Sequence, residues 1–236
     1  MSTQSVVYIC AHPDDIESAT GTLTLLRRKG YTIHDFCLTP GQRGYKLPGQ
    51  TRRVGLVPPN SELAATRIKE EQAACAVIGA ELTMFDEMDG ELYAHRAICE
   101  KVAAKLAEIK PAAVITLWAL EKPDHSAAFS IAYKALHLNE LYWTTEFYMS
   151  RADGSGYHFR PDLYVNVSNV IEQKKAVAAC YPSQLSGDPA DYALRQARMH
   201  GQAASCDYAE GFSTSVPLVG TRWDRPAEIG RLLLGL

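Results

Sequence analysis

The sequence is poor in the features that mark several protein classes. Of its 236 residues, 47% are hydrophobic, yet no apolar run comes near the roughly 20 residues that a membrane-spanning helix needs. The formal net charge is −3, so the bulk charge gives no sign of a nucleic-acid-binding surface. The segment 1–10 has no basic stretch followed by a long apolar one, so we expect no signal peptide.

Close-spaced cysteine pairs are also missing. The six cysteines never form a C-x-x-C spacing, and most lie in apolar stretches, where a free thiol behaves as a small hydrophobic group. This pattern argues against a cysteine zinc cluster and favours a reduced, cytoplasmic protein. Repeats, low-complexity tracts and linkers are absent as well, so we expect a single domain over residues 1–236.

Short apolar runs rich in β-branched residues alternate with longer helical segments. We expect Ser61 to cap the second helix and Gly79 to end it. The alternation predicts an α/β fold, a single-domain Rossmann-like three-layer sandwich with a mainly parallel sheet, whose ligands bind beyond the carboxyl ends of the strands. The expected strands are 5–10, 32–38, 81–85, 112–118, 142–149 and 163–167, and the expected helices are 16–29, 62–78, 95–109, 126–138 and 170–180, with helix and loop mixed after 184.

The loop after the first expected strand reads AHPDD, residues 11–15. His12 and Asp15 are three residues apart and can turn toward one cation, because zinc accepts both imidazole nitrogen and carboxylate oxygen. Pro13 restricts how this loop turns. The alternative interpretation of the same residues is a helix cap made by Asp14 or Asp15.

The loop after the fourth expected strand reads KPDH, residues 122–125. If the fourth strand lies near the first, His125 faces the same end of the sheet as His12. Two histidines and Asp15 then make a three-ligand site with an open position for water, as catalytic zinc sites require. Taken alone, His125 would be an ordinary surface or core histidine, so the metal hypothesis depends on both loops together.

AHPDD followed by PDH resembles the signature of the LmbE/PIG-L family of zinc-dependent N-deacetylases. Outside such a family, Gly21 would be interpreted as a small residue at a close contact between a helix and the sheet. Further matches extend along about the whole chain, namely Gly21-Thr22-Leu23, Arg67 with Glu70 and Gly79, Asp89-Gly90-Glu91-Leu92, Lys174 with Ser183-Gln184, and Tyr208-Ala209-Glu210 with Phe212.

The resemblance implies zinc held by His12, Asp15 and His125, with other divalent metals as alternatives. It also implies that Asp14 is the general base and that the substrate is a small molecule, an N-acylated amino sugar such as an N-acetylglucosamine conjugate. Zinc activates water and stabilises an oxyanion, and Asp14 could pass a proton to the leaving amine, so the set is consistent with amide hydrolysis. Family members are often oligomeric, which leaves a homo-oligomer open.

Two positions depart from the family pattern. Lys122 stands where the motif HPDH has its first histidine, and Gln42 follows Gly41 where Gly-Glu is common. Lys122 could donate to an oxyanion and so join the catalytic residues, with a solvated surface lysine as the alternative. Gln42 could bind a sugar hydroxyl in place of the missing charge.

The segment 39–60 carries basic side chains and no acid. One interpretation is a solvated loop. The other is a lid over residues 43–53 that grips a phosphate or carboxylate of the substrate. The basic residues are Arg43, Lys46, Arg52 and Arg53.

Arg67, Asp89 and Trp118 complete the predicted substrate-binding residues together with Gln42. A structural ion pair or a turn is the alternative for Arg67 and Asp89, and a core position is the alternative for Trp118, which could also stack on a sugar. The other histidines have no ligand-like spacing and are interpreted as surface or core residues. They are His34, His95, His137, His158 and His200.

Three functions stay open beside amino-sugar deacetylation. One is an amidase acting on another acylated amine, and a second is a metal-binding relative without hydrolytic activity, which Lys122 keeps open. The third is a nucleotide-binding domain. It is disfavoured because G-x-G-x-x-G does not follow the first strand and because carboxylates stand where a pyrophosphate would bind.

Overall fold

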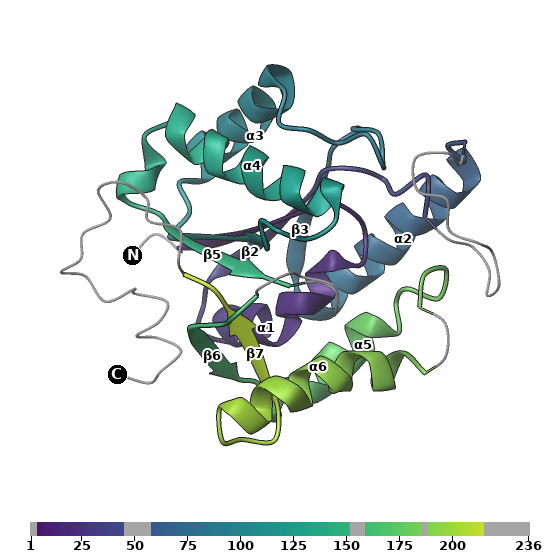
Figure 1. The fold of residues 1–236 in the computed structure, drawn as a ribbon, viewed down its shortest axis with the longest axis vertical. Helices are drawn as coiled ribbons and strands as arrows, with labels where there is room; N and C mark the ends of the chain where they lie inside the picture. The colour runs from purple at the N-terminus through teal and green to yellow at the C-terminus, as the bar shows by residue number, and fades with distance from the viewer. Residues whose placement is uncertain (1–3, 45–57, 152–158, 186–187, 215–236) are drawn as a thin grey trace.

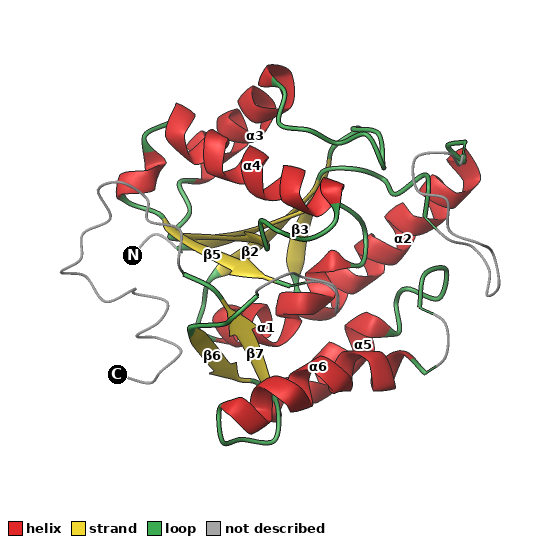
Figure 2. Ribbon diagram, in the orientation of Figure 1, coloured by secondary structure: helices red, strands yellow, loops and turns green. Residues whose placement is uncertain are grey.

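The computed structural model describes residues 4–44, 58–151, 159–185 and 188–214, which form three layers (Figures 1 and 2). The central layer is a parallel sheet with the strand order β3-β2-β1-β4-β5. This arrangement confirms the predicted α/β fold with a mainly parallel sheet. The strands are β1 (Ser5–Cys10), β2 (Thr32–Cys37), β3 (Ala80–Met84), β4 (Ala113–Leu117) and β5 (Glu146–Ser150).

Helices cover both faces of the sheet. In Figure 1, α3 (Arg96–Ile109) and α4 (Pro123–Leu138) lie above it. The helices α1 (Thr20–Arg28), α2 (Ser61–Ile78), α5 (Ile171–Ala178) and α6 (Pro189–Ala203) lie on the other side. A small antiparallel pair, β6 (Leu163–Asn166) and β7 (Ala209–Phe212), packs against α6. Short 3-10 turns are η1 (Asp15–Ala19), η2 (Leu141–Trp143) and η3 (Ser168–Val170).

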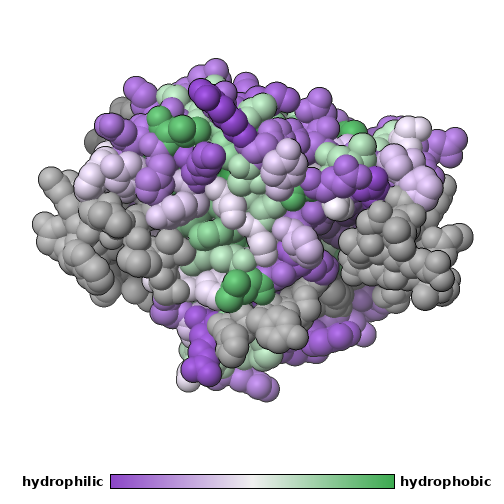
Figure 3. Space-filling view, turned by 45° about the horizontal axis from the view of Figure 1, so that its top comes forward, coloured by the Kyte–Doolittle hydropathy of each residue, from purple (hydrophilic) through white to green (hydrophobic). Residues whose placement is uncertain are grey.

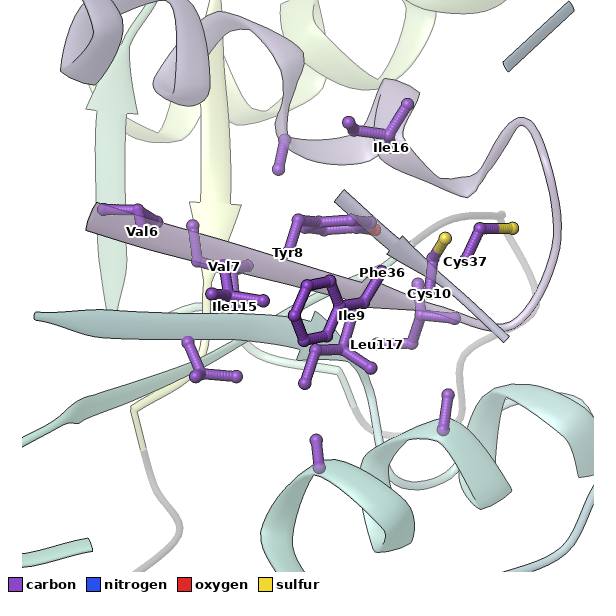
Figure 4. Close-up of a cluster of buried hydrophobic side chains, with 14 of the residues drawn as sticks. Val6, Val7, Tyr8, Ile9, Cys10, Ile16, Phe36, Cys37, Ile115 and Leu117 are labelled. Carbon is purple, nitrogen blue, oxygen red and sulfur yellow. The ribbon is translucent and has the colours of Figure 1, made fainter. Parts of the chain in front are cut away.

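Strand β1 is the centre of the core. Its residues 6–10 are fully buried, and their side chains leave the strand on both sides of the sheet (Figure 4). A parallel strand covered on both faces is expected to be a continuous apolar run, which is why its bounds could be predicted residue for residue. Four of the six cysteines are buried as free thiols, and these are Cys10, Cys37, Cys75 and Cys99.

Several predicted boundaries differ from the structure. Helix α2 begins one residue early because Asn60, and not Ser61, caps it by accepting the Leu63 N–H. Gly79 ends the same helix with φ 69°, as predicted, since glycine tolerates the left-handed conformation. Helix α4 begins at Pro123, three residues earlier than expected, because proline suits the first turn of a helix.

Two further segments were predicted only in part. The expected helix 16–29 opens as the 3-10 turn η1 before α1 begins. The expected strand 142–149 divides into the turn η2 and the strand β5. Strand β7 was not predicted as a strand, because it pairs with β6 across a long stretch of chain and not with a sequence neighbour.

The described side chains on the face that Figure 3 shows are mainly polar. Figure 3 shows hydrophilic side chains over most of the α3 and α4 face, with hydrophobic groups in small patches between them. Within the described residues, no helix is long and apolar enough to cross a membrane.

A buried ion cluster joins α1, α5 and β7. Glu210 accepts the backbone N–H groups of Gly21 and Thr22 at 2.8 Å each, and so caps the start of α1. The Lys174 ammonium lies 2.9 Å from both the Glu210 and the Glu17 carboxylates. Gly21 is required here, because an added Cβ would lie 2.6 Å from Val167 Cγ1.

We expect Lys174→Met to destabilise the protein by about 3–5 kcal/mol, because it leaves two buried carboxylates without their cation. The measurement is the free energy of unfolding in urea. Lys175→Met is the matched control, since the Lys175 pair with Glu172 is exposed and should change stability by less than about 0.5 kcal/mol. Equal effects of the two substitutions would contradict a supporting role for the cluster.

Candidate metal centre

Parallel pairing of β1 with β4 brings two polar loops together. Ile9 lies opposite Thr116, so the loop 11–15 and the segment 118–125 leave neighbouring strands at the same end of the sheet. His12, Asp15 and His125 place ligand atoms within 4.8 Å of one another. His125 Nε2 is 3.2 Å from Asp15 Oδ1, and His12 Nδ1 is 3.6 Å from Asp15 Oδ2.

Other groups orient each of these three side chains. His125 Nδ1 lies 2.6 Å from Glu121 Oε2, which leaves Nε2 directed toward Asp15. His12 Nε2 lies 3.1 Å from Asp124 and 3.2 Å from Asp89, and these three residues form a second group that could hold a cation. Carboxylates bound to the far nitrogen of a histidine are a regular feature of metal centres.

Asp15 is oriented by the backbone. Its Oδ2 accepts the backbone N–H groups of Ala11 at 3.1 Å and of His12 at 2.8 Å, so this carboxylate stabilises the loop in which it lies. Asp14 occupies the N-cap position of η1 without a side-chain capping bond. The helix-cap interpretation therefore describes neither carboxylate.

The electrostatics of this cluster favour positive charge. Burial alone would lower the pKa of His125, but Asp15 and Glu121 raise it to about 9. Burial likewise opposes the charged form of His12, yet hydrogen bonds that its ring donates to Asp124, Asp15 and Asp89 raise its pKa well above the ordinary value. A divalent cation would supply the same positive charge to this donor set, so the residues fit a metal.

Asp14 lies beside the three candidate ligands with a partly accessible carboxylate. Its side chain is 27% exposed, and its Oδ1 is 3.1 Å from Arg67 Nη2. Burial raises the pKa of this carboxyl to about 6, although Arg67 and Lys122 act to lower it. A carboxyl with a pKa near neutrality is suited to accept and return a proton.

Arg67 is almost fully buried on α2, where it joins two loops. Its guanidinium donates to the carbonyl oxygens of Gly41 and Pro13 as well as to Asp14. A Cβ on Gly41 would lie 2.2 Å from Arg67 Nη1, and one on Gly44 would lie 2.3 Å from it. Arg67 thus connects the loops after β1 and β2, which is close to the structural ion pair considered as an alternative from the sequence.

Gln42 and Asp89 connect the loops that follow β2 and β3. Gln42 donates to the Glu87 carbonyl and accepts the Asp89 N–H, both at 3.3 Å, so both ends of its amide are engaged. Asp89 accepts the Arg43 N–H at 2.9 Å through the oxygen that does not face His12. These contacts hold the loops beside the candidate metal ligands.

Lys122 and Trp118 border the same end of the sheet. Lys122 is the N-cap residue of α4, three positions before His125, and it is near enough to Asp14 to lower the pKa of that carboxyl. Trp118 follows β4 and makes an edge contact with Phe159, with ring centroids 5.5 Å apart.

The predicted lid falls on residues 45–57, which hold Lys46, Arg52 and Arg53 and lie outside the described residues. The lid therefore stays a prediction.

Among the described residues, the remaining histidines belong to no candidate metal group. His34 faces Glu81, and His95 caps α3 and lies 2.8 Å from Glu87. His137 stacks on Tyr142, and His200 is buried beside Tyr164. His158 lies outside the described residues.

Three buried acids near the candidate ligands were not selected from the sequence. Glu121 lies four residues before His125, just outside α4, and Asp124 lies inside the KPDH motif itself. Glu71 accepts the backbone N–H of Asp14 from α2, and no local spacing indicates this contact.

Comparison with known proteins agrees with this geometry. A family model described as GlcNAc-PI de-N-acetylase, PIG-L, matches residues 7–136, which include every residue of the candidate centre. The chain belongs to the PIG-L family. The family resemblance inferred from the two motifs is therefore confirmed.

The relatives of this PIG-L chain differ in activity. A 4-oxalmesaconate hydratase of Pseudomonas putida is 25% identical and is aligned over 92% of this chain and 91% of its own length. A diacetylchitobiose deacetylase of Thermococcus kodakarensis is 24% identical over 88% of this chain and 82% of its own. A conserved protein of Thermus thermophilus shares the fold with a TM-score of 0.73, 26% identity and coverage of 95% and 100%.

We expect Glu121→Gln to raise the Kd for zinc by about tenfold or more, because the His125 imidazole would lose the carboxylate that orients it. Competition with a chromophoric chelator measures this Kd. Glu87→Gln is the matched control, since Glu87 makes the same kind of contact with His95, outside the candidate metal groups. Equal zinc affinities for the two variants would count against this centre.

Proposed function

We propose that the protein is a metal-dependent hydrolase that removes an acyl group from the amide nitrogen of a small acylated amine. The favoured substrate is an N-acetylated amino sugar, such as an N-acetylglucosamine conjugate. The observation that carries this proposal is the convergence of His12, Asp15 and His125 beside the Asp14 carboxylate. The family description and the deacetylase relative support the same reaction class.

Zinc is the metal that this donor set suits best. Two imidazole nitrogens and one carboxylate oxygen match its ligand preferences, and three protein ligands leave a position open, although iron, cobalt and nickel accept the same donors. When bound, the ion would supply Lewis acidity that activates water and polarises the amide carbonyl.

Asp14 would move the proton in this reaction. Its carboxylate is accessible, adjacent in sequence to Asp15, and has a pKa of about 6. It would accept a proton from the attacking water and return it to the nitrogen of the leaving amine, which departs as a neutral amine. Arg67 keeps the carboxylate in place through its contact at 3.1 Å.

Lys122 and Trp118 are the residues we assign to the substrate side. The Lys122 ammonium could donate to the oxygen that gains negative charge, which is a role an electrostatic donor can fill without moving a proton. Trp118 follows β4 and is half-buried, and the face of its indole could stack on a sugar ring. Gln42, Asp89 and Arg67 would act on the substrate indirectly, because their polar groups hold the surrounding loops.

A second candidate function is hydration of a small unsaturated carboxylic acid. It is favoured by the hydratase relative, which is aligned over nearly the whole chain. The same base and cation could activate water for addition to a carbon–carbon double bond, and Lys122 could pair with a substrate carboxylate. This reaction differs from the alternatives considered from the sequence. Whether the chain forms a homo-oligomer stays a prediction.

We expect the zinc-loaded protein to release acetate from N-acetylglucosamine derivatives, and a chelator to abolish this activity. Asp14→Asn should lower kcat by about 10²–10⁴-fold while zinc remains bound, because the amide cannot accept the proton. The measurements are acetate release and zinc per chain. Asp86→Asn, in an exposed carboxylate after β3, should leave kcat unchanged.

A parallel assay decides between the two candidate functions. Water addition to unsaturated dicarboxylates is followed by loss of ultraviolet absorbance, with the same variants. Hydration without acetate release would replace the deacetylase proposal, and retention of full activity in Asp14→Asn would remove Asp14 from either mechanism.

A further inference from the structure

Asp14 has an unusual backbone conformation. Its φ is 104° and its ψ is −22°. Lys110, Glu140 and Ser205 also have positive φ, but their values of 49–57° lie near the ordinary left-handed region, whereas that of Asp14 does not. A residue with a side chain keeps such a conformation only when neighbouring groups hold it.

Helix α2 supplies those groups. The peptide unit between Pro13 and Asp14 has one carbonyl oxygen and one N–H, and α2 binds both. Arg67 Nη2 donates to the Pro13 carbonyl, and Glu71 Oε2 accepts the Asp14 N–H at 2.9 Å. Arg67 and Glu71 are four residues apart and therefore lie on the same face of the helix. Holding both ends of one peptide group fixes its plane, and with it the direction in which the Asp14 side chain leaves the backbone.

Glu71 is itself held deep in the core. Its side chain is fully buried, as is that of Asp35 on β2. The thiols of Cys10 and Cys75 donate to the two oxygens of Asp35, each at 3.6 Å. Figure 4 shows Cys10 and Cys37 at the ends of neighbouring strands, with their sulfur atoms on the same side of the sheet as Ile16.

The protonation of Glu71 and Asp35 is compatible with Glu71 accepting the backbone N–H of Asp14. Burial and the neighbouring Asp35 raise the pKa of Glu71 well above its usual value, and burial raises the pKa of Asp35 to about 6. One shared proton between Glu71 and Asp35 avoids two adjacent buried charges. Glu71 can then donate that proton toward Asp35 while Oε2 still accepts the Asp14 N–H.

We propose that Glu71 is a positioning residue for the Asp14 carboxylate, and that it acts by accepting the Asp14 N–H and so holding the Pro13–Asp14 peptide plane. The consequence for catalysis rests on the proposed function, in which Asp14 is the base. The placement of the peptide does not depend on that function and can be measured separately.

Two substitutions at one position test the proposal. Glu71→Gln keeps an oxygen that can accept the Asp14 N–H and an amide that can donate to Asp35, so it should retain kcat within about threefold. Glu71→Leu fills similar space without an acceptor. It should lower kcat by about 10- to 100-fold at nearly unchanged KM and zinc content, because the base is displaced while the ligands stay.

Amide hydrogen exchange gives a readout that is independent of activity. In the zinc-loaded protein, the Asp14 N–H should exchange slowly, because it is bonded to a buried acceptor. Exchange should become faster in Glu71→Leu and return close to the original rate in Glu71→Gln. Glu70→Leu is the matched control. Glu70 is the adjacent carboxylate on α2, but it binds the N–H and hydroxyl of Ser183, so its loss should leave Asp14 exchange and kcat unchanged.

Three results would overturn the proposal. The first is unchanged Asp14 exchange in Glu71→Leu, and the second is equal loss of kcat in Glu71→Gln and Glu71→Leu. The third is a second metal ion per chain that disappears in Glu71→Leu, which would make Cys10, Asp35 and Glu71 a cation site. If the wild-type protein hydrolyses no acylated amine, the proposed function fails, and the exchange rates still decide the role of Glu71.

Discussion

The concentration of buried negative charge around two histidines is the constraint on which the rest of this structure depends. Asp15, Asp89, Asp124 and Glu121 all direct carboxylate oxygens at the imidazoles of His12 and His125. Burying several carboxylates together is costly unless positive charge meets them. The neighbouring carboxylates raise the pKa values of both histidines, and a divalent cation would supply positive charge to the same carboxylates. His12, Asp15 and His125 therefore form a group that could hold a metal ion.

Side chains of helix α2 hold the loops that surround this centre. Arg67, Glu70 and Glu71 are close in sequence, and together they bind the loops after β1 and β2 and the turn at Ser183. Arg67 joins the loops after β1 and β2, Glu70 holds the turn at Ser183, and Glu71 holds the backbone of Asp14. A long helix is a rigid support, so groups on it can keep loop residues in conformations that the loops would not adopt alone. In this chain the candidate base Asp14 lies on a loop, and contacts from α2 hold its backbone.

Much of the fold could be predicted because its strands and helices follow from local sequence patterns. The bounds of β1 followed from a continuous apolar run, and the end of α2 followed from Gly79. The candidate ligands could be selected because the motifs AHPDD and PDH follow expected strands, and the pairing of β1 with β4 brings these two loops together. The contacts of Gln42 could not be predicted. A glutamine after a strand suggests a group for substrate, and no local spacing indicates that its amide bridges Glu87 and Asp89.

The alternation of strands and helices, the family, and the residue types at the carboxyl ends of the strands could all be predicted from the sequence. Periodicity and motif spacing are local properties, so they can be recognised in a single sequence. Which acids contact which partners became known from the folded structure alone. Glu71 reaches Asp14 across 57 positions, and Glu210 reaches Gly21 across 189. Contacts at such separations depend on the order of strands in the sheet and on the packing of helices over it, and neither is encoded in any short stretch of residues.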